Sequence, residues 1–274
     1  MTFNFRAAMD DSSMGGRTWQ AKKWYKESMD ELIKIPVPLI NEGESESDGG
    51  QLAYFLEQQA QVLNPALLII YGGGGHAKSL IDLIQSLETW KIAGIVDDRL
   101  DRGSLILGIP VLGGGEILHS LRARGIRYAV NAVGGIGDIS LRLEVFDKLR
   151  NAGFSFPTVC HPRGFIEPSA KVGDGCQILF GSYVGSDVSI GFGCLLNSGV
   201  ILSHDCFLGD YVNISPGSTL AGSVTIGEKS MIGMGVTINL GLTIGAGVSI
   251  GNSAVIKADV PEGMHIRAGA IWPQ

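Results

Sequence analysis

The sequence predicts two structural units, a small Rossmann-like α/β domain and, after it, a parallel β-helix of about five coils. Two observations carry this prediction: aliphatic residues recur at every sixth position between Ile166 and Ile256, and an apolar segment in front of this array ends in a run of glycines. A third observation agrees with both. Gly accounts for 40 of the 274 residues, about twice its usual share, which indicates many tight turns or close backbone contacts.

The six-residue period defines the β-helix. Every sixth residue from Ile166 to Ile256 is Ile, Val or Leu, and the residue four places further on is nearly always small. This period fits neither a strand, which alternates at two, nor a helix, which repeats at 3.6. Each hexad therefore predicts one short strand and one corner, and three hexads make a coil whose aliphatic residues are buried by stacking. Gly often follows the aliphatic residue, and we expect it to relax the backbone at the bend.

The segment before the array has the signals of an α/β domain. An apolar run at 66–71 ends in GGGGH, a helical pattern covers 77–87, and a second strand at 90–98 ends in Asp97 and Asp98. Gly72, Gly74 and Ala77 match G-x-G-x-x-A, the pattern of a dinucleotide site. A glycine turn that opens a helix offers free N–H groups to a phosphate. A tight turn without any ligand stays open as the alternative. Further elements are expected at 106–114 (strand and turn), 116–125 (helix), 127–135 (strand) and 139–153 (helix).

The first 65 residues carry no recognisable chemistry. We expect helices at 17–34 and 51–63 and a flexible linker at 36–51. The predicted division of the chain is an N-terminal extension (1–65), an α/β domain (66–157), a β-helix (158–260) and a C-terminal tail (261–274).

Charge and composition exclude several classes of protein. The net charge of −6 disfavours nucleic acid as a partner, because phosphate binding needs clustered Lys and Arg. The sequence has no run of 18 apolar residues and no signal peptide at its start, so we expect no membrane span and a cytoplasmic location. The four Cys show no C-x-x-C pair. We expect Cys176 and Cys194, one coil apart, to be reduced core thiols.

The two units occur together in a known family. The loop GGGGHAK with the following VDD, joined to a hexad array that contains LSHDC, resembles the sugar acetyltransferases of the sialic-acid O-acetyltransferase type. It resembles more closely the nucleotide-4-amino-sugar N-acetyltransferases of bacillosamine and perosamine synthesis. The resemblance covers about residues 66–260. It implies a left-handed β-helix, a homotrimer, acetyl-CoA bound along the β-helix between two subunits, and a nucleotide sugar in place of NAD on the α/β domain.

The resemblance also assigns roles to individual residues. His204 would be the general base and Asp205 its orienting carboxylate, and Gly222, one coil above, would donate its N–H to the thioester oxygen. A base is needed because the acceptor must lose a proton as it attacks the thioester, and imidazole exchanges a proton near neutral pH. Asn213 would help to bind the acetyl donor. The residues expected to hold the phosphate, sugar and nucleoside are Gly73, Gly74, Gly75, His76, Lys78, Asp97 and Asp98.

The sequence departs from the family at its end. The tail has Ala268 and Ala270 where the family has Gly and Pro in a turn that contacts coenzyme A, and Arg267 is the candidate to replace those contacts. No metal is expected. His204 is the only His inside the hexad array, which counts against a three-His metal site of the γ-carbonic-anhydrase type.

Three functions follow in order of preference. The first is acetyl-CoA-dependent N-acetylation of a nucleotide-linked 4-amino-4,6-dideoxy sugar by direct transfer. The second is O-acetylation of sialic acid or a related sugar. The third is a non-catalytic scaffold that binds nucleotide sugars. The sequence fixes neither the nucleotide nor the sugar.

Overall fold

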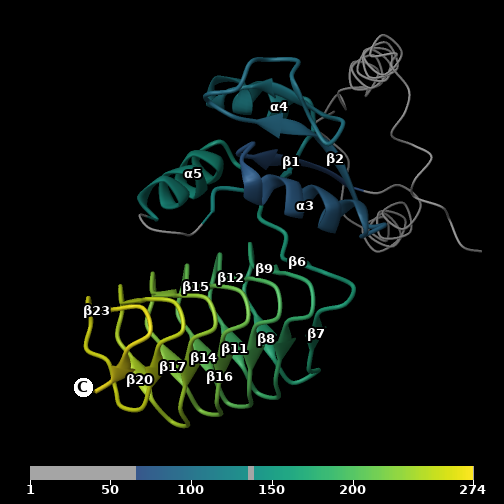
Figure 1. The fold of residues 1–274 in the computed structure, drawn as a ribbon. Coiled ribbons are helices and arrows are strands. Elements are labelled where there is room, and N and C mark those ends of the chain that lie inside the picture. Colours follow the sequence, from purple (N-terminus) through teal and green to yellow (C-terminus); the bar gives the residue numbers. More distant parts are fainter. Residues whose placement is uncertain (1–65, 135–138, 274) are drawn as a thin grey trace, which may run out of the picture.

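The protein consists of two units, the α/β domain and the β-helix, stacked on each other (Figure 1). The computed structural model describes residues 66–134 and 139–273. The helices expected at 17–34 and 51–63 and the linker between them lie outside the described residues.

The α/β domain is built on a five-stranded sheet in the order β3-β4-β2-β1-β5. Strands β1 (Ala66–Tyr71), β2 (Trp90–Val96), β4 (Ile109–Gly113) and β5 (Tyr128–Asn131) are parallel, and β3 (Leu105–Ile106) pairs antiparallel with β4 at the edge. The strand and turn expected at 106–114 correspond to β4 and the residues after it, but the hairpin with β3 was not foreseen. Leu107 and Gly108 both have positive φ, 46° and 81°, and a pair of such residues makes a tight hairpin turn.

Helices cover both faces of this sheet. Helix α3 (Gly75–Gln85) lies on the face turned toward the β-helix, and the short 3₁₀ helix η1 (Gly115–Ile117), α4 (Leu118–Ala123) and α5 (Ser140–Asn151) lie on the other (Figure 1). The side chains of alternate residues in β1 point to opposite faces, so Leu68 packs with α3 and Ile69 with α4 and α5. The same core cluster that holds α3 includes Leu179 and Leu195 of the β-helix, so the two units share a hydrophobic interface.

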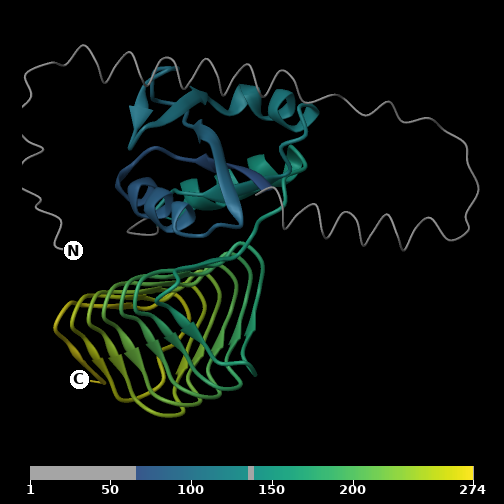
Figure 2. The ribbon, with the colours of Figure 1, turned by 90° about the vertical axis from the view of Figure 1, so that its right-hand side faces the viewer.

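The β-helix has three parallel sheets of two-residue strands, seen end-on as a stack of prism-shaped coils in Figure 2. Sheet 1 comprises β6 (Val159–Cys160), β9 (Gln177–Ile178), β12 (Leu195–Leu196), β15 (Asn213–Ile214), β18 (Met231–Ile232), β21 (Ser249–Ile250) and β23 (His265–Ile266). Sheet 2 comprises β7 (Phe165–Ile166), β10 (Tyr183–Val184), β13 (Ile201–Leu202), β16 (Thr219–Leu220), β19 (Thr237–Ile238), β22 (Val255–Ile256) and β24 (Ile271–Trp272). Sheet 3 comprises β8 (Lys171–Val172), β11 (Ser189–Ile190), β14 (Phe207–Leu208), β17 (Thr225–Ile226) and β20 (Thr243–Ile244).

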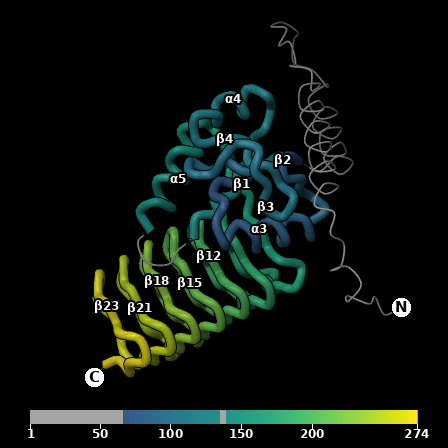
Figure 3. The backbone as a smooth tube through the Cα atoms, turned by 45° about the horizontal axis from the view of Figure 1, so that its top comes forward, coloured from purple at the N-terminus to yellow at the C-terminus, as the bar shows by residue number. Residues whose placement is uncertain are grey.

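The predicted aliphatic column forms the interior of this stack. Its members from Ile178 to Ile256 are buried in one continuous cluster, together with the small residues four places on, among them Cys176, Cys194 and Cys206. These three Cys are free thiols, as the sequence predicts. Sheet 1 faces the α/β domain, and its later strands β18, β21 and β23 extend beyond α3 (Figure 3).

The stack continues past residue 260, where the sequence places the end of the β-helix. Ile266 pairs with Ile250 and Trp272 with Ile256, so the final coil advances by 16 residues, whereas Ile250 pairs with Ile232 at the usual spacing of 18. Val260 takes the buried position that strict hexad counting gives to residue 262. The expected tail is therefore part of the coil stack.

The glycines that follow the aliphatic residues have a different role from the one expected. They do not adopt the left-handed conformation, but a Cβ on Gly173 would lie 2.8 Å from the carbonyl oxygen of Gly191 in the next coil. The expectation of backbone relaxation was wrong there, because these glycines make room for a neighbouring coil. The bend lies two residues later, where Gly175 has φ +71° and Asp187 has φ 57°.

Candidate active site

The glycine loop opens a cleft at the carboxyl ends of the parallel strands. Helix α3 starts at Gly75 with Gly74 as its N-cap and no acidic residue in its first turn, so its N-terminal N–H groups and positive dipole end suit an anion. The cleft has a volume of about 780 Å³. It is lined by the predicted residues Gly73, Gly74, Gly75, His76, Asp97 and Asp98, and by Tyr71, Gly72, Arg99, Ala132, Val133, Gly134, Leu141 and Val145.

Asp97 holds the loop in shape. Its Oδ2 accepts a hydrogen bond of 2.7 Å from the N–H of Gly73, and its Oδ1 accepts from the N–H groups of Arg99 and Leu100. A Cβ on Gly73 would lie 2.3 Å from a methyl group of Leu100 and 2.8 Å from one of Ile106, so a larger residue would have to displace these side chains. The N–H of Gly73 is therefore committed to Asp97, which leaves Gly75 and His76 as the better phosphate donors.

Asp98 ties three elements together beside the cleft. It accepts hydrogen bonds from the N–H of Gly115 (2.7 Å), the hydroxyl of Tyr71 (2.8 Å) and Nζ of Lys148 on α5 (3.2 Å). Burial acts to raise the pKa of Asp98, but these three donors outweigh it and lower the pKa. Burial raises the pKa of the Tyr71 hydroxyl far above its usual value, and the hydrogen bond to Asp98 and the charge of Asp98 add to this rise.

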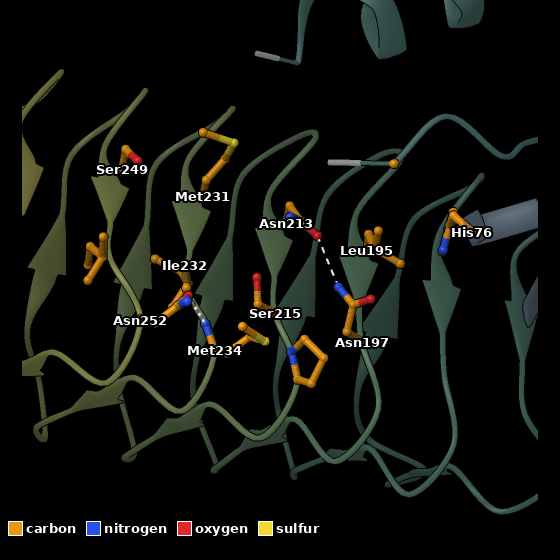
Figure 4. A pocket seen from close by; sticks show the side chains of 14 residues that line it. His76, Leu195, Asn197, Asn213, Ser215, Met231, Ile232, Met234, Ser249 and Asn252 are labelled. Carbon is orange, nitrogen blue, oxygen red and sulfur yellow. Dashed lines mark hydrogen bonds between the residues drawn. The ribbon is translucent and has the colours of Figure 1, made fainter. Parts of the chain in front are cut away.

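A second cavity runs as a groove along sheet 1 and its following corner. Figure 4 shows its side chains on successive coils, from Leu195 and Asn197 through Asn213 and Ser215 to Met234 and Asn252. The groove meets the loop cleft at His76 and Gly134, which line both. The other lining residues are Pro216, Met231, Ile232, Gly233, Ser249 and Ile250.

Asn213 lies in this groove, buried on β15. Its side-chain oxygen accepts a hydrogen bond of 3.2 Å from Nδ2 of Asn197, which also donates to the carbonyl of Ile214 (Figure 4). Sequence reasoning missed Asn197. A polar residue directly after the aliphatic column, where Gly is usual, was the available signal.

His76 is anchored from the β-helix. Its Nε2 lies 2.7 Å from Oε1 of Gln177 on β9, and Nε2 of Gln177 donates to the carbonyl of Asn131 at 2.7 Å. Burial lowers the pKa of His76 and Arg142 adds to this, while the hydrogen bond to Gln177 acts the other way. Gln177 and Asn131 are both buried, and neither was predicted as a site residue. The contact between His76 and Gln177 joins residues 101 positions apart, which no local pattern reveals.

His204 and Asp205 occupy the corner between sheets 2 and 3. Nδ1 of His204 lies 2.7 Å from Oδ2 of Asp205. Since a carboxylate only accepts, Nδ1 carries the proton of this bond, and in a neutral ring Nε2 is then the nitrogen that can accept a proton. Asp205 has φ 60°, the left-handed corner position, which turns its carboxylate back toward the ring. Gly222, predicted one coil further on, lies against the ring, since a Cβ on it would be 2.5 Å from Cε1 of His204.

The structure brings the predicted residues together in two groups. Gly73–His76, Asp97 and Asp98 surround the loop cleft, and Asn213 lies in the adjoining groove. His204, Asp205 and Gly222 form a separate cluster that lines neither of these cavities. Lys78 and Arg267 are exposed and also lie outside both cavities. Arg267 follows β23 at the hexad position that Asn197 holds after β12, so it extends the corner of the groove.

Comparison with known proteins matches both units. Residues 67–149 match the family model "PglD N-terminal domain", and residues 205–240 match "Bacterial transferase hexapeptide (six repeats)". The structure of a His-to-Ala mutant of GDP-perosamine N-acetyltransferase from Caulobacter crescentus, in complex with CoA and GDP-perosamine, is 34% identical with a TM-score of 0.69. The match covers 73% of this chain and 92% of that one. The chain belongs to the hexapeptide-repeat sugar acetyltransferases.

Two further solved structures are similar to the chain. The acetyltransferase domain of PglB from Neisseria gonorrhoeae, in complex with acetyl coenzyme A, is 32% identical over 77% of this chain and all of that one, with a TM-score of 0.69. WeeI from Acinetobacter baumannii, at 24% identity over 73% of this chain and 95% of that one (TM-score 0.63), shares the fold. No curated protein sequence matches the chain.

Family membership settles the coarse properties of the chain. The β-helix is the left-handed parallel kind, and the protein is an acyltransferase that uses acetyl-CoA as co-substrate to acetylate a sugar. In the part of the chain that the structure describes, no helix is both long and apolar enough to cross a membrane.

Proposed function

We propose that this enzyme transfers an acetyl group from acetyl-CoA to the amino group of a nucleotide-linked 4-amino-4,6-dideoxy sugar. The observation that carries the proposal is the junction of the two cavities at His76 and Gly134. A nucleotide sugar needs a phosphate site beside a sugar site, and the donor needs a groove that ends at the sugar. We assign the nucleotide sugar to the loop cleft and the acetyl donor to the sheet 1 groove.

The substrates fit the chemistry of the two cavities. The nucleotide would lie in the loop cleft with its phosphates at the N-terminus of α3, near Gly75 and His76. The pantetheine arm of coenzyme A, which alternates amides with methylene groups, matches a groove that alternates Asn197, Asn213 and Asn252 with Met231 and Met234. Arg267, farther along the same corner, would meet the phosphates of coenzyme A.

In the proposed reaction His204 acts as the base. Nε2 takes a proton from the amine as its nitrogen attacks the thioester carbon, and the C–S bond then breaks to release the coenzyme A thiolate, which His204 reprotonates. Asp205 stabilises the imidazolium because its carboxylate accepts the hydrogen bond from Nδ1–H. The N–H of Gly222 would donate to the oxygen that becomes negative during the attack. The related complexes of the Caulobacter enzyme with CoA and GDP-perosamine include variants in which one His is replaced by Ala or Asn.

A homotrimer would complete this site. His204 lies at the corner after sheet 2, whereas the groove follows sheet 1, so a neighbouring copy would bring its own His204 to the groove. The outer face of sheet 2 beside His204 supports this, because Phe165, Tyr183 and Ile201 are exposed there, and Phe165 stacks on Tyr183 with only 6° between the rings. Light scattering after size exclusion tests the trimer; a monomer active at full rate would refute the shared site.

The location proposed for this enzyme is the cytoplasm. All four Cys are free, and unpaired thiols suit a reducing compartment.

Thermal unfolding with added ligands tests the proposal. The protein is heated with UDP-, GDP- and dTDP-linked 4-amino sugars, with and without coenzyme A, because a ligand that binds the native state raises its melting temperature. We expect one nucleotide sugar to stabilise it and coenzyme A to add to the effect. The same sugars are then assayed for acetyl transfer beside sialic acid. Acetylation of a hydroxyl alone would favour the O-acetyltransferase, and binding without transfer would favour the scaffold.

A further inference from the structure

The amide of Gln177 can be orientated from its partners alone. Its nitrogen lies 2.7 Å from the backbone carbonyl of Asn131, and a carbonyl oxygen only accepts hydrogen bonds. The NH₂ group must therefore face Asn131, and the oxygen of Gln177 must face His76. Because that oxygen is an acceptor 2.7 Å from Nε2 of His76, Nε2 must carry a proton.

This contact also fixes what the other ring nitrogen can do. In a neutral imidazole with its proton on Nε2, Nδ1 is an acceptor. The charged group that acts on the ring is Arg142 on α5, which disfavours a second proton. Asp97, Asp98 and Arg99 line the loop cleft with His76, and the groove that His76 also lines contains the neutral side chains of Asn197 and Asn213.

We propose that Gln177 is a positioning residue that holds His76 as the neutral Nε2–H tautomer, so that Nδ1 accepts a hydrogen bond from the acceptor sugar where the two cavities meet. This inference rests on the proposed function for the identity of the ligand, a sugar that offers a hydroxyl or amine hydrogen at that point. Gln177 itself touches no substrate. It lies on β9, the second strand of sheet 1, and connects the β-helix to the first turn of α3.

The tautomer is measured directly in the full-length protein without substrate. Long-range ¹H–¹⁵N NMR of ¹⁵N-histidine-labelled protein separates the two ring nitrogens, and His76→Asn identifies the His76 signals as those that disappear. We expect a neutral ring with its proton on Nε2 at neutral pH. A ring protonated on Nδ1, or charged at neutral pH, would overturn the proposal whatever the enzyme acetylates.

Kinetics of two variants test the consequence. Gln177→Glu places a carboxylate beside His76 and favours the charged ring, so KM for the nucleotide sugar should rise about tenfold, most at acidic pH, with KM for acetyl-CoA unchanged. Gln177→Met keeps the length without the polar atoms, and we expect a smaller rise with no pH dependence. The exposed Gln85→Glu on α3 makes the same chemical change away from His76 and should match the wild type.

The outcomes separate the two proposals. If the wild type acetylates no nucleotide sugar, the proposed function fails, while the NMR result still decides the tautomer. If transfer occurs and Gln177→Met leaves KM for the nucleotide sugar unchanged at every pH, the positioning role fails and the function stands. Should Gln177→Glu not fold, Gln177→Met and the wild-type spectrum decide.

Discussion

A Cβ atom on Gly222 would lie 2.5 Å from Cε1 of His204 and 2.7 Å from its Nε2. Gly222, one coil further on, therefore packs against the imidazole, and a larger residue would fit there only if the ring moved. These two residues share one hexad position, two places after the aliphatic residue. In all the remaining hexads of the array this position has a residue other than Gly, for example Asp174, Ser186 and Asp210. The single Gly at this position lies where the ring needs the space.

Gly222→Ala should displace His204 and leave the fold intact. The ring is largely exposed, so it can swing aside without strain in the core, but Nε2 then leaves its working position. We expect kcat to fall by about a hundredfold with the melting temperature unchanged. Ala246→Ser, which adds one atom at the equivalent position of another corner, is the matched control. A fully active Gly222→Ala would show that the ring position does not matter.

Asp205→Asn should separate electrostatics from backbone strain. Asn tolerates the left-handed conformation that Asp205 adopts, so stability should be kept, but its amide cannot stabilise an imidazolium as a carboxylate does. We expect kcat to fall roughly tenfold or more. Asp205→Ala should lose the same rate and in addition about 1 kcal/mol of stability, because Ala is strained at positive φ. Stopped-time acetylation assays and urea unfolding measure the two effects. Equal rates for Asp205→Asn and the wild type would remove the carboxylate from the mechanism.

The β-helix core is predictable from the sequence because each buried aliphatic residue belongs to a strict period. The period alone also places Gly222 above His204, since 18 residues make one coil. It fails at the end of the stack, where the coil between Ile250 and Ile266 is shortened by two residues. There Val260 becomes the interior residue, which no constant period foresees.

The α/β domain and its contact with the β-helix show where sequence reasoning stops. The glycine loop and the strand that ends in Asp97 are local signals, so the cleft is predictable. The role of Asp97 as a clamp on Gly73, and of Asp98 as a tie to Lys148, depends on tertiary packing. Arg142 illustrates the same limit. It lies in the helix expected at 139–153, but nothing in that pattern indicates that its side chain is 1% exposed.

Asp98 should make the stability of the folded protein depend on pH in the acidic range. Its pKa is lowered in the folded protein by Gly115, Tyr71 and Lys148 against the effect of burial. A lowered pKa means that the contribution of Asp98 is fully present above the pKa of the unfolded chain, about 4, and is lost as the pH falls through the folded value. Asp98→Asn should therefore melt below the wild type at neutral pH, and the difference should shrink as the pH falls below the pKa of the unfolded chain.

Thermal unfolding across this pH range measures the effect. The exposed Asp101→Asn, three residues along the same loop, is the control and should show no pH-dependent difference. A gap between Asp98→Asn and the wild type that stays constant down to the lowest pH would mean that the carboxylate charge is not what binds Lys148 and Gly115.

Arg142 on α5 is a buried cation whose removal should depend on what replaces it. Its Nη2 donates to the carbonyl of Gly193 at 2.7 Å, and its guanidinium lies 5.7 Å from the centre of the Phe146 ring. Within the described structure Nε and Nη1 are buried without a hydrogen-bond partner. Such donors lose their hydration without compensation, and burial lowers the pKa of the group.

Arg142→Met should accordingly lie within about 1 kcal/mol of the wild type in unfolding free energy, because Met fills most of the volume and leaves no donor unsatisfied. Arg142→Ala should cost about 2–4 kcal/mol, since it opens a cavity between α5 and the β-helix. Urea unfolding measures both, with the exposed Arg124→Met as the control for losing one positive charge. If Met destabilises as much as Ala, the bond to Gly193 and the contact with Phe146 outweigh the two unsatisfied N–H groups, and Arg142 would then be a net stabilising link between the two units.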